Sequence, residues 1–136
     1  MILSIDDTAR FAAEAQARGQ RVVFTNGVFD LLHPGHVRFL EQTRAKGDAL
    51  IVGINSDRWA RVQKGPARPV IPERERAEII AALRVVDVAV IVDDETTQAI
   101  VERLKPIVVV NPADVPMEQG WSSSAIIKKA QSVPGR

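Results

Sequence analysis

Both histidines of the chain, His33 and His36, lie three residues apart in a short segment that follows an apolar run. Pro34 and Gly35 separate them and favour the start of a helix at this point. The first turn of a helix carries unsatisfied N–H groups that attract anions. Gly27, a few residues earlier, allows the backbone to approach a ligand closely. Two imidazoles at a helix N-terminus therefore predict a phosphate site held by His33 and His36.

Short apolar runs alternate with helical periods on both sides of this turn. Strands are predicted over residues 21–24, 49–54, 85–92 and 107–110. Helices are predicted over residues 4–17, 37–46 and 96–104, from residue 72, and after residue 122. Residues 55–71 show no regular period. This alternation predicts an α/β fold, a Rossmann-like open parallel sheet flanked by helices.

Ligands of such sheets bind at the carboxyl ends of the strands. That rule brings together segments that are distant in sequence: residues 25–36, residues 55–64, those from 111 onward, and a run of three serines at 122–124. We therefore expect these four segments to surround one crevice, with the histidine turn on one of its sides.

The composition is that of a single globular domain over residues 1–136, with a helix in residues 1–20 ahead of a core in residues 21–131. The net charge of +1 argues against a nucleic-acid partner or an anionic membrane surface. The chain has no cysteine and only two histidines, so we expect no metal site of its own. No apolar run is long enough to span a bilayer and no signal-peptide pattern is present, so we expect a cytoplasmic protein.

The segment from Asn26 to His36 resembles the first signature of the HxGH nucleotidyltransferase superfamily, which includes cytidylyltransferases and pantetheine-phosphate adenylyltransferase. The residues that match this signature are Gly27, Phe29, Asp30, His33, Gly35 and His36. A second signature, a serine or threonine cluster that opens the last helix, is matched by residues 122–124. The distant serine cluster and the strand–turn–helix setting make the resemblance more specific than the two histidines alone.

Within that superfamily the chain resembles the adenylyltransferase domain of ADP-heptose synthesis in particular. This similarity rests on residues 25–30, 47–48, 55–57, 64–65, 68–70, 76 and 124–129. It implies transfer of AMP from ATP to D-glycero-β-D-manno-heptose 1-phosphate, giving ADP-heptose and pyrophosphate for lipopolysaccharide core biosynthesis. It also implies that ATP and a sugar 1-phosphate bind, that Mg²⁺ arrives with the ATP, and that the protein is a homo-oligomer, a dimer.

The residue types and the resemblance together define three groups of site residues. The expected catalytic residues are His33, His36 and Lys64. The residues expected to contact the nucleotide are Asn26, Gly27, Val28, Phe29, Gly35, Arg76, Ser122, Ser123 and Ser124. Those expected to contact the acceptor are Asp30, Asn55 and Asp57. Structural roles stay open beside these: Asp30 could brace a turn, and Asp57 could cap one. Arg76 could pair with Glu73, three residues earlier on a helix.

The chain departs from the family pattern after Pro106. A substrate loop, a helix and a strand of the family have no counterpart before Ile107, so that either the protein lost them or a loop is omitted there. Two other functions stay open. A cytidylyltransferase that acts on glycerol 3-phosphate or a similar alcohol phosphate carries the same histidine signature. A non-catalytic nucleotide-binding module would account for the missing sugar loop.

Overall fold

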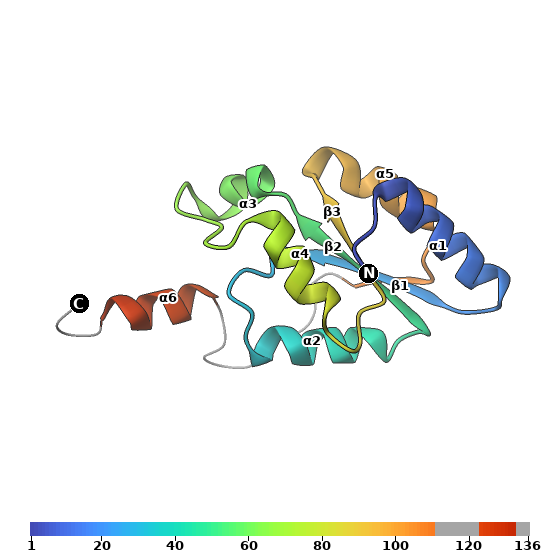
Figure 1. The fold of residues 1–136 in the computed structure, drawn as a ribbon, viewed down its shortest axis with the longest axis horizontal. Coiled ribbons are helices and arrows are strands. Elements are labelled where there is room, and N and C mark those ends of the chain that lie inside the picture. The colour runs from blue at the N-terminus through green and yellow to red at the C-terminus, as the bar shows by residue number, and fades with distance from the viewer. Residues whose placement is uncertain (111–122, 133–136) are drawn as a thin grey trace.

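The computed structural model describes residues 1–110 and 123–132. Its four described strands form one parallel sheet in the order β3-β2-β1-β4 (Figure 1). β1 (Val22–Gly27) and β2 (Ala49–Asn55) lie in the centre, and β3 (Val88–Val92) and β4 (Val108–Val110) lie at the edges. The predicted α/β class with an open parallel sheet is confirmed.

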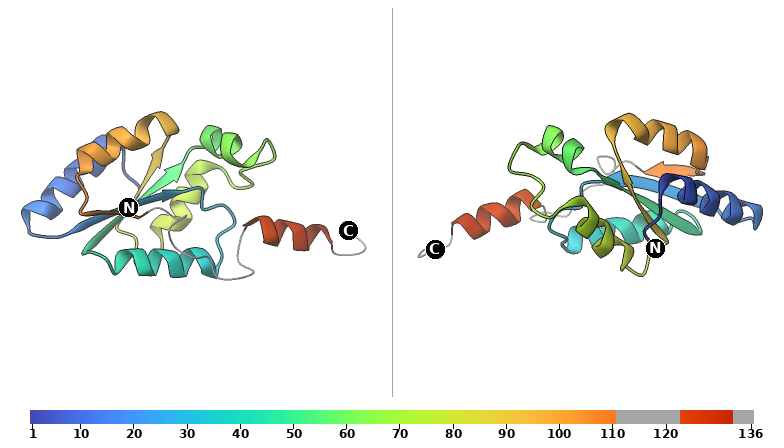
Figure 2. Two further views of the ribbon diagram at one scale, coloured as in Figure 1. Left: turned by 180° about the vertical axis from the view of Figure 1, so that it is seen from behind. Right: turned by 45° about the horizontal axis from the view of Figure 1, so that its top comes forward.

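Helices cover both faces of the sheet. The described helices are α1 (Ile5–Ala17), α2 (Pro34–Arg44), α3 (Asp57–Lys64), α4 (Glu73–Ala81), α5 (Asp94–Leu104) and α6 (Ser123–Gln131). α1 and α5 pack together on one face, and α2 and α4 lie on the other (Figure 2). α3 follows the carboxyl end of β2, and α6 extends away from the sheet.

Two hydrophobic cores form because successive side chains of a strand point to opposite faces. Towards α2 and α4, the sheet contributes Val23, Leu50, Val52, Ile54, Ala89 and Val110. Towards α1 and α5, it contributes Val22, Phe24, Ile51, Val88, Val90 and Val92. β2 is buried along its whole length, as its near-continuous apolar sequence predicts.

Two elements next to the histidine turn extend beyond their predicted limits. β1 continues through Asn26 to Gly27, so the strand itself carries part of the expected site. α2 begins at Pro34 instead of residue 37, because His33 acts as its N-cap. The histidines therefore occupy the first turn of α2 and lie at the carboxyl edge of the sheet.

The helix α3 was not predicted, since its arginines and the nearby prolines and glycine suggested an irregular segment. The side chain of Ser56 caps it by accepting from the N–H of Trp59 at 3.1 Å. Gly65 ends it at a φ of 98°, a left-handed conformation that glycine adopts without strain. This helix brings residues 59–64 over the end of the sheet.

The chain is continuous from Pro106 to Ile107. The N–H of Ile107 donates to the carbonyl of Val22 at 2.8 Å, and β4 then pairs directly with β1. The explanation that a loop is omitted at this position is therefore wrong, and the short connection belongs to the chain itself.

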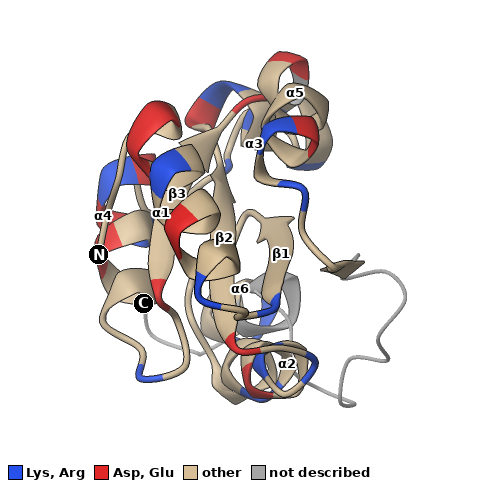
Figure 3. Cartoon of the chain, turned by 90° about the vertical axis from the view of Figure 1, so that its right-hand side faces the viewer, with Lys and Arg blue, Asp and Glu red and all other residues tan. Residues whose placement is uncertain are grey.

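Acidic and basic residues are interspersed over the helices that Figure 3 shows. None of the helices within the described residues is long and apolar enough to cross a membrane.

Candidate functional site

A cavity of about 580 Å³ opens at the carboxyl ends of β1, β2 and β4. This size falls in the range of small-molecule sites. The strand ends and α3 line it with Asn26, Gly27, Val28, Asn55, Trp59, Gln63 and Lys64. Thr97 of α5 and Val109 and Val110 of β4 close the other side. Five of the predicted residues therefore meet in one place: Asn26, Gly27, Val28, Asn55 and Lys64.

His33 and His36 form the first turn of α2, beside this cavity and outside its lining. Nδ1 of His33 accepts from the N–H of Gly35 at 3.1 Å, and Nδ1 of His36 accepts from the N–H of His33 at 3.3 Å. The two rings are stacked with their centroids 3.8 Å apart. The ring of Phe29 meets His36 edge-on at 5.6 Å. The pair is thus held rigidly by the helix cap that it forms.

These hydrogen bonds determine which nitrogen of each histidine carries the proton. A neutral imidazole that accepts at Nδ1 must have its proton on Nε2. Burial lowers the pKa of His33, and burial with the neighbouring His33 and Lys64 lowers the pKa of His36 to about 4, against a smaller raising effect of Asp30. Both rings are neutral at neutral pH and have Nε2–H groups as donors.

Lys64 ends α3 at the rim of the cavity and is exposed. Its charge lowers the pKa of His36, so the two groups lie within electrostatic range of each other. The start of α3 is fixed to the end of β3, because Asp93 accepts from the hydroxyl of Ser56 at 2.9 Å and from Arg58 at 2.6 Å. That anchor sets where the far end of the helix presents Lys64.

Asp30 is buried and holds a loop that is distant in sequence. Its carboxylate accepts from the N–H groups of Val70 and Ile71 at 2.7 and 3.0 Å and from Nε of Arg68 at 3.2 Å. Its side chain has no exposed area. The structure therefore gives Asp30 a bracing role in place of the predicted acceptor contact, since both carboxylate oxygens are engaged inside the protein.

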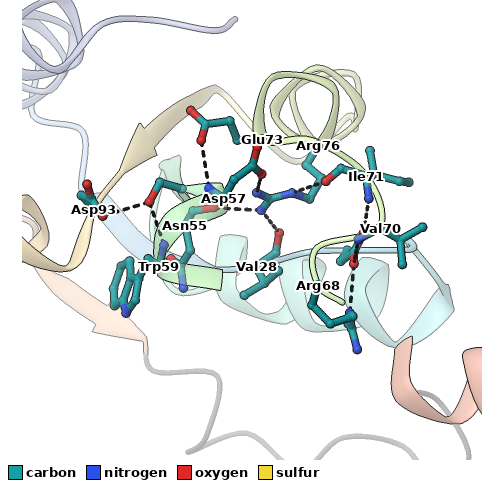
Figure 4. A network of polar contacts seen from close by, with 12 residues as sticks. Val28, Asn55, Asp57, Trp59, Arg68, Val70, Ile71, Glu73, Arg76 and Asp93 are labelled. Atoms are coloured by element: carbon teal, nitrogen blue, oxygen red, sulfur yellow. Dashed lines mark hydrogen bonds and ion pairs between the residues drawn. The ribbon is translucent and has the colours of Figure 1, made fainter. Parts of the chain in front are cut away.

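Arg76 is completely buried and joins three segments at the carboxyl edge of the sheet: the turn after β1, the junction of β2 and α3, and the segment before α4 (Figure 4). Its guanidinium donates to the carbonyls of Val28, Asn55 and Ile71 at 2.6 to 2.9 Å and to the carboxylate of Asp57 at 2.7 Å. The predicted contact of Arg76 with nucleotide phosphates is replaced by this structural role. Oδ1 of Asp57 accepts the bond from Arg76 while its side chain is 27% exposed, so the predicted contact of Asp57 with the acceptor stays a prediction.

Glu73 does not pair with Arg76 through its carboxylate, because that group accepts from the N–H of Asp57 at 2.9 Å. A Cβ at Gly27 would lie 3.0 Å from the ring of Phe29, a tighter contact than packed side chains usually make, so a larger residue here would have to displace that ring. Phe29 and Leu31 both adopt a φ of 52°, which is uncommon for residues with side chains. The turn is thus built around Phe29, which is buried, and presents its backbone to the site.

The remaining predicted residues are Gly35, in the cap of α2, and the three serines at 122–124. Gly35 donates its N–H to His33 and is buried. Ser123 and Ser124 form the start of α6. Ser122 lies outside the described residues. Within residues 1–110 and 123–132, no group of three or more His, Asp or Glu side chains is arranged to hold a metal ion.

Five residues that line the cavity were not predicted, among them Thr97, Val109 and Val110. The other two are Trp59 and Gln63. Both lie on α3, one helical turn apart, and the carboxamide of Gln63 accepts from Asn55 at 3.0 Å. Ser56 as an N-cap and Gly65 as a stop could have predicted this helix and with it the shared face of these two residues.

Comparisons with known proteins agree with this geometry. Residues 24–132 match the family model described as cytidylyltransferase-like. The bifunctional protein HldE of Geobacter metallireducens is 47% identical over 113 residues, which cover 83% of this chain and 23% of that protein. HldE of Wolinella succinogenes is 37% identical over 147 residues, covering 96% and 31% of the two chains. This chain spans about a quarter to a third of these relatives.

A solved structure extends the similarity to the fold. The lipopolysaccharide core biosynthesis protein of Thermoplasma volcanium superposes with a TM-score of 0.64 at 29% identity, over 83% of this chain and 88% of that one. The alignment with the Wolinella protein is longer than the 136 residues of this chain. That relative therefore contains residues with no counterpart here, consistent with a shorter connection in this chain.

Proposed function

Because the chain belongs to the cytidylyltransferase-like family of nucleotidyltransferases, we propose that it transfers AMP from ATP to D-glycero-β-D-manno-heptose 1-phosphate. The products are ADP-heptose and pyrophosphate, for lipopolysaccharide core biosynthesis. The observation that carries the proposal is a pair of histidine Nε2–H donors at the start of α2, next to a cavity with a lysine at its rim. The names of the relatives and of the structural neighbour support the heptose substrate.

In the proposed reaction, a phosphate oxygen of the sugar phosphate attacks the α-phosphorus of ATP. The new O–P bond forms as the bond to the β-phosphate oxygen breaks, and pyrophosphate leaves with that electron pair. His33 and His36 donate from Nε2 to phosphate oxygens on which negative charge builds, and Lys64 neutralises part of that charge. No residue forms a covalent intermediate.

In-line phosphoryl transfer requires that the attacking and leaving groups lie on opposite sides of the phosphorus. The histidines begin α2, on the face of the sheet away from α5. The cavity is lined by the ends of β1, β2 and β4 together with α3 and α5, and by no residue of α2. We therefore assign the triphosphate to the α2 side and the acceptor sugar to the cavity, with Lys64 between them.

Mg²⁺ is proposed to enter as the complex with ATP and to be bound by triphosphate oxygens. The groups nearest the site are neutral imidazoles and a lysine, whereas Mg²⁺ prefers oxygen ligands. A dimeric assembly also stays a proposal.

Pyrophosphate release tests the function directly. Purified protein is supplied with ATP or CTP together with heptose 1-phosphate or glycerol 3-phosphate, and wild type is compared with His36→Ala. We expect turnover with ATP and heptose 1-phosphate, and a loss of roughly 100- to 1000-fold in His36→Ala, as for removal of one preorganised donor. Turnover with CTP and glycerol 3-phosphate alone would overturn the choice of substrates. ATP binding without pyrophosphate release in any combination would indicate a non-catalytic nucleotide-binding module.

A further inference from the structure

Three side-chain amides form a chain of hydrogen bonds along one wall of the cavity. Nδ2 of Asn26 donates to Oδ1 of Asn55 at 3.0 Å, and Nδ2 of Asn55 donates to Oε1 of Gln63 at 3.0 Å. Asn55 is only 3% exposed, whereas Gln63 is exposed. All three residues line the cavity. The chain of amides thus runs from Asn26 on β1, through the buried Asn55 at the end of β2, to the accessible side chain of Gln63 on α3.

The direction of these hydrogen bonds determines which atoms a ligand meets. Because Oε1 of Gln63 is engaged by Asn55, its NH₂ group is the part that can donate to a ligand. At the other end, Asn26 uses its NH₂ group on Asn55 and keeps Oδ1 as an acceptor. Rotating the amide of Asn55 would disrupt hydrogen bonds on both sides of a buried residue. The wall therefore offers a donor at Gln63 and an acceptor at Asn26.

A hydroxyl group suits such a wall because it both donates and accepts. A sugar carries several hydroxyl groups, and the cavity of about 580 Å³ has room for one beside the charge of Lys64. We propose that Gln63 determines specificity by reading a hydroxyl group of the acceptor sugar, held in its donating orientation by Asn55. This assignment rests on the proposed function and adds a residue to it.

Side-chain amides also recognise the edges of nucleotide bases. We place the acceptor here because neither histidine of the proposed phosphate site lines this cavity, which α5 closes on the side away from α2. Occupation by the base of ATP is the alternative outcome of the test.

Steady-state kinetics of pyrophosphate release separate the two substrates. Gln63→Met keeps the size of the side chain and removes its donor. In Asn55→Asp, the new carboxylate accepts a hydrogen bond from the NH₂ group of Gln63. The carboxamide of Gln63 must therefore turn and present Oε1 to the cavity. Gln42→Met is the matched control, the same change at an exposed helical position away from the cavity.

We expect the KM for heptose 1-phosphate to rise roughly 3- to 10-fold in Gln63→Met, the effect of losing one neutral hydrogen bond. The KM for ATP should stay unchanged in Gln63→Met and both KM values in Gln42→Met. Asn55→Asp should raise the acceptor KM by a similar factor, and the double variant should be no worse than Asn55→Asp alone, because both changes remove the same donor.

If wild type turns over normally, two results would overturn this inference and leave the proposed function intact. One is an acceptor KM in Gln63→Met within twofold of wild type. The other is a rise in the KM for ATP in place of the acceptor KM, which would place the base in the cavity. Absence of turnover by wild type with every sugar phosphate, and of any heat of binding for heptose 1-phosphate in calorimetry, overturns the proposed function together with this inference.

Discussion

Replacement of Arg76 by methionine should destabilise the protein strongly, because the guanidinium holds three separate segments of the chain together and methionine has no donor to do so. The variant removes the donor from three carbonyls, those of Val28, Asn55 and Ile71, and leaves Asp57 without its cation. Leaving one buried polar group unsatisfied costs about 1–3 kcal/mol. Asp57 is partly exposed and recovers some hydration.

Breaking a buried ion pair by removing one partner typically costs about 3–5 kcal/mol. We expect Arg76→Met to fall in this range, a large share of the roughly 5–15 kcal/mol that stabilises an ordinary domain. Urea unfolding followed by circular dichroism measures it as a lower midpoint at an unchanged slope. Arg74→Met is the control, since Arg74 is exposed on the same helix, and it should change stability by at most about 0.5 kcal/mol.

Arg76→Lys keeps the charge but loses the planar fork that serves several acceptors at once. It should also destabilise, by less than the methionine variant. The reasoning fails if both variants unfold within about 1 kcal/mol of wild type while the KM for ATP rises by tenfold or more. That pattern would return Arg76 to the nucleotide-binding role that its sequence position suggests.

Two further changes probe the half-buried His36 and the buried Asp30. Since the folded chain lowers the pKa of His36 from 6.5 to about 4, the unfolded chain binds more protons and stability falls as the pH drops from about 6.5 towards 4. Between pH 7 and 4.5, the free energy of unfolding of His36→Asn should therefore fall by up to about 2 kcal/mol less than that of wild type, allowing for screening by solvent. Urea unfolding at both pH values measures this difference, and an equal fall in the two proteins would contradict it. Asp30→Asn places an NH₂ group against its N–H donors and should cost about 2–4 kcal/mol, whereas the exposed Asp6→Asn should cost about 0.5 kcal/mol or less. Equal midpoints for these two variants would exclude the bracing role of Asp30.

The fold could be predicted because each strand is a short apolar run bounded by turn residues. The histidine turn could also be predicted, because the residues that cap α2 lie within three positions of each other. Local interactions of this kind leave a pattern in the sequence. The helix α3 was missed because Arg58, Arg61 and Lys64 obscure its single buried position, Ala60.

The roles of Asp30 and Arg76 could not be predicted, because their partners are far away in the sequence. Arg76 reaches the carbonyl of Val28, 48 positions earlier, and Asp30 accepts from the loop around Val70, 40 positions later. Charged residues are mostly exposed, so a charged residue near a phosphate signature is more readily assigned to a ligand than to the interior. Here Asp30 and Arg76 hold neighbouring segments in place, and three amide side chains line the cavity beside Lys64.

The protonation of the histidine pair limits the chemistry that this site supports. Each Nδ1 accepts a backbone hydrogen bond, and each neutral ring therefore holds its proton on Nε2. Such rings donate from Nε2 and hold no ring nitrogen that could accept a proton as a general base. Among the described residues that line the cavity none is a carboxylate, and Asp30 is engaged on both oxygens. An alcohol acceptor would have to lose its proton to a base, whereas a phosphate acceptor is already ionised at neutral pH, with a second pKa near 6. Within the described residues, donors without a base therefore support the proposed attack by a phosphate oxygen, which forms a new pyrophosphate bond.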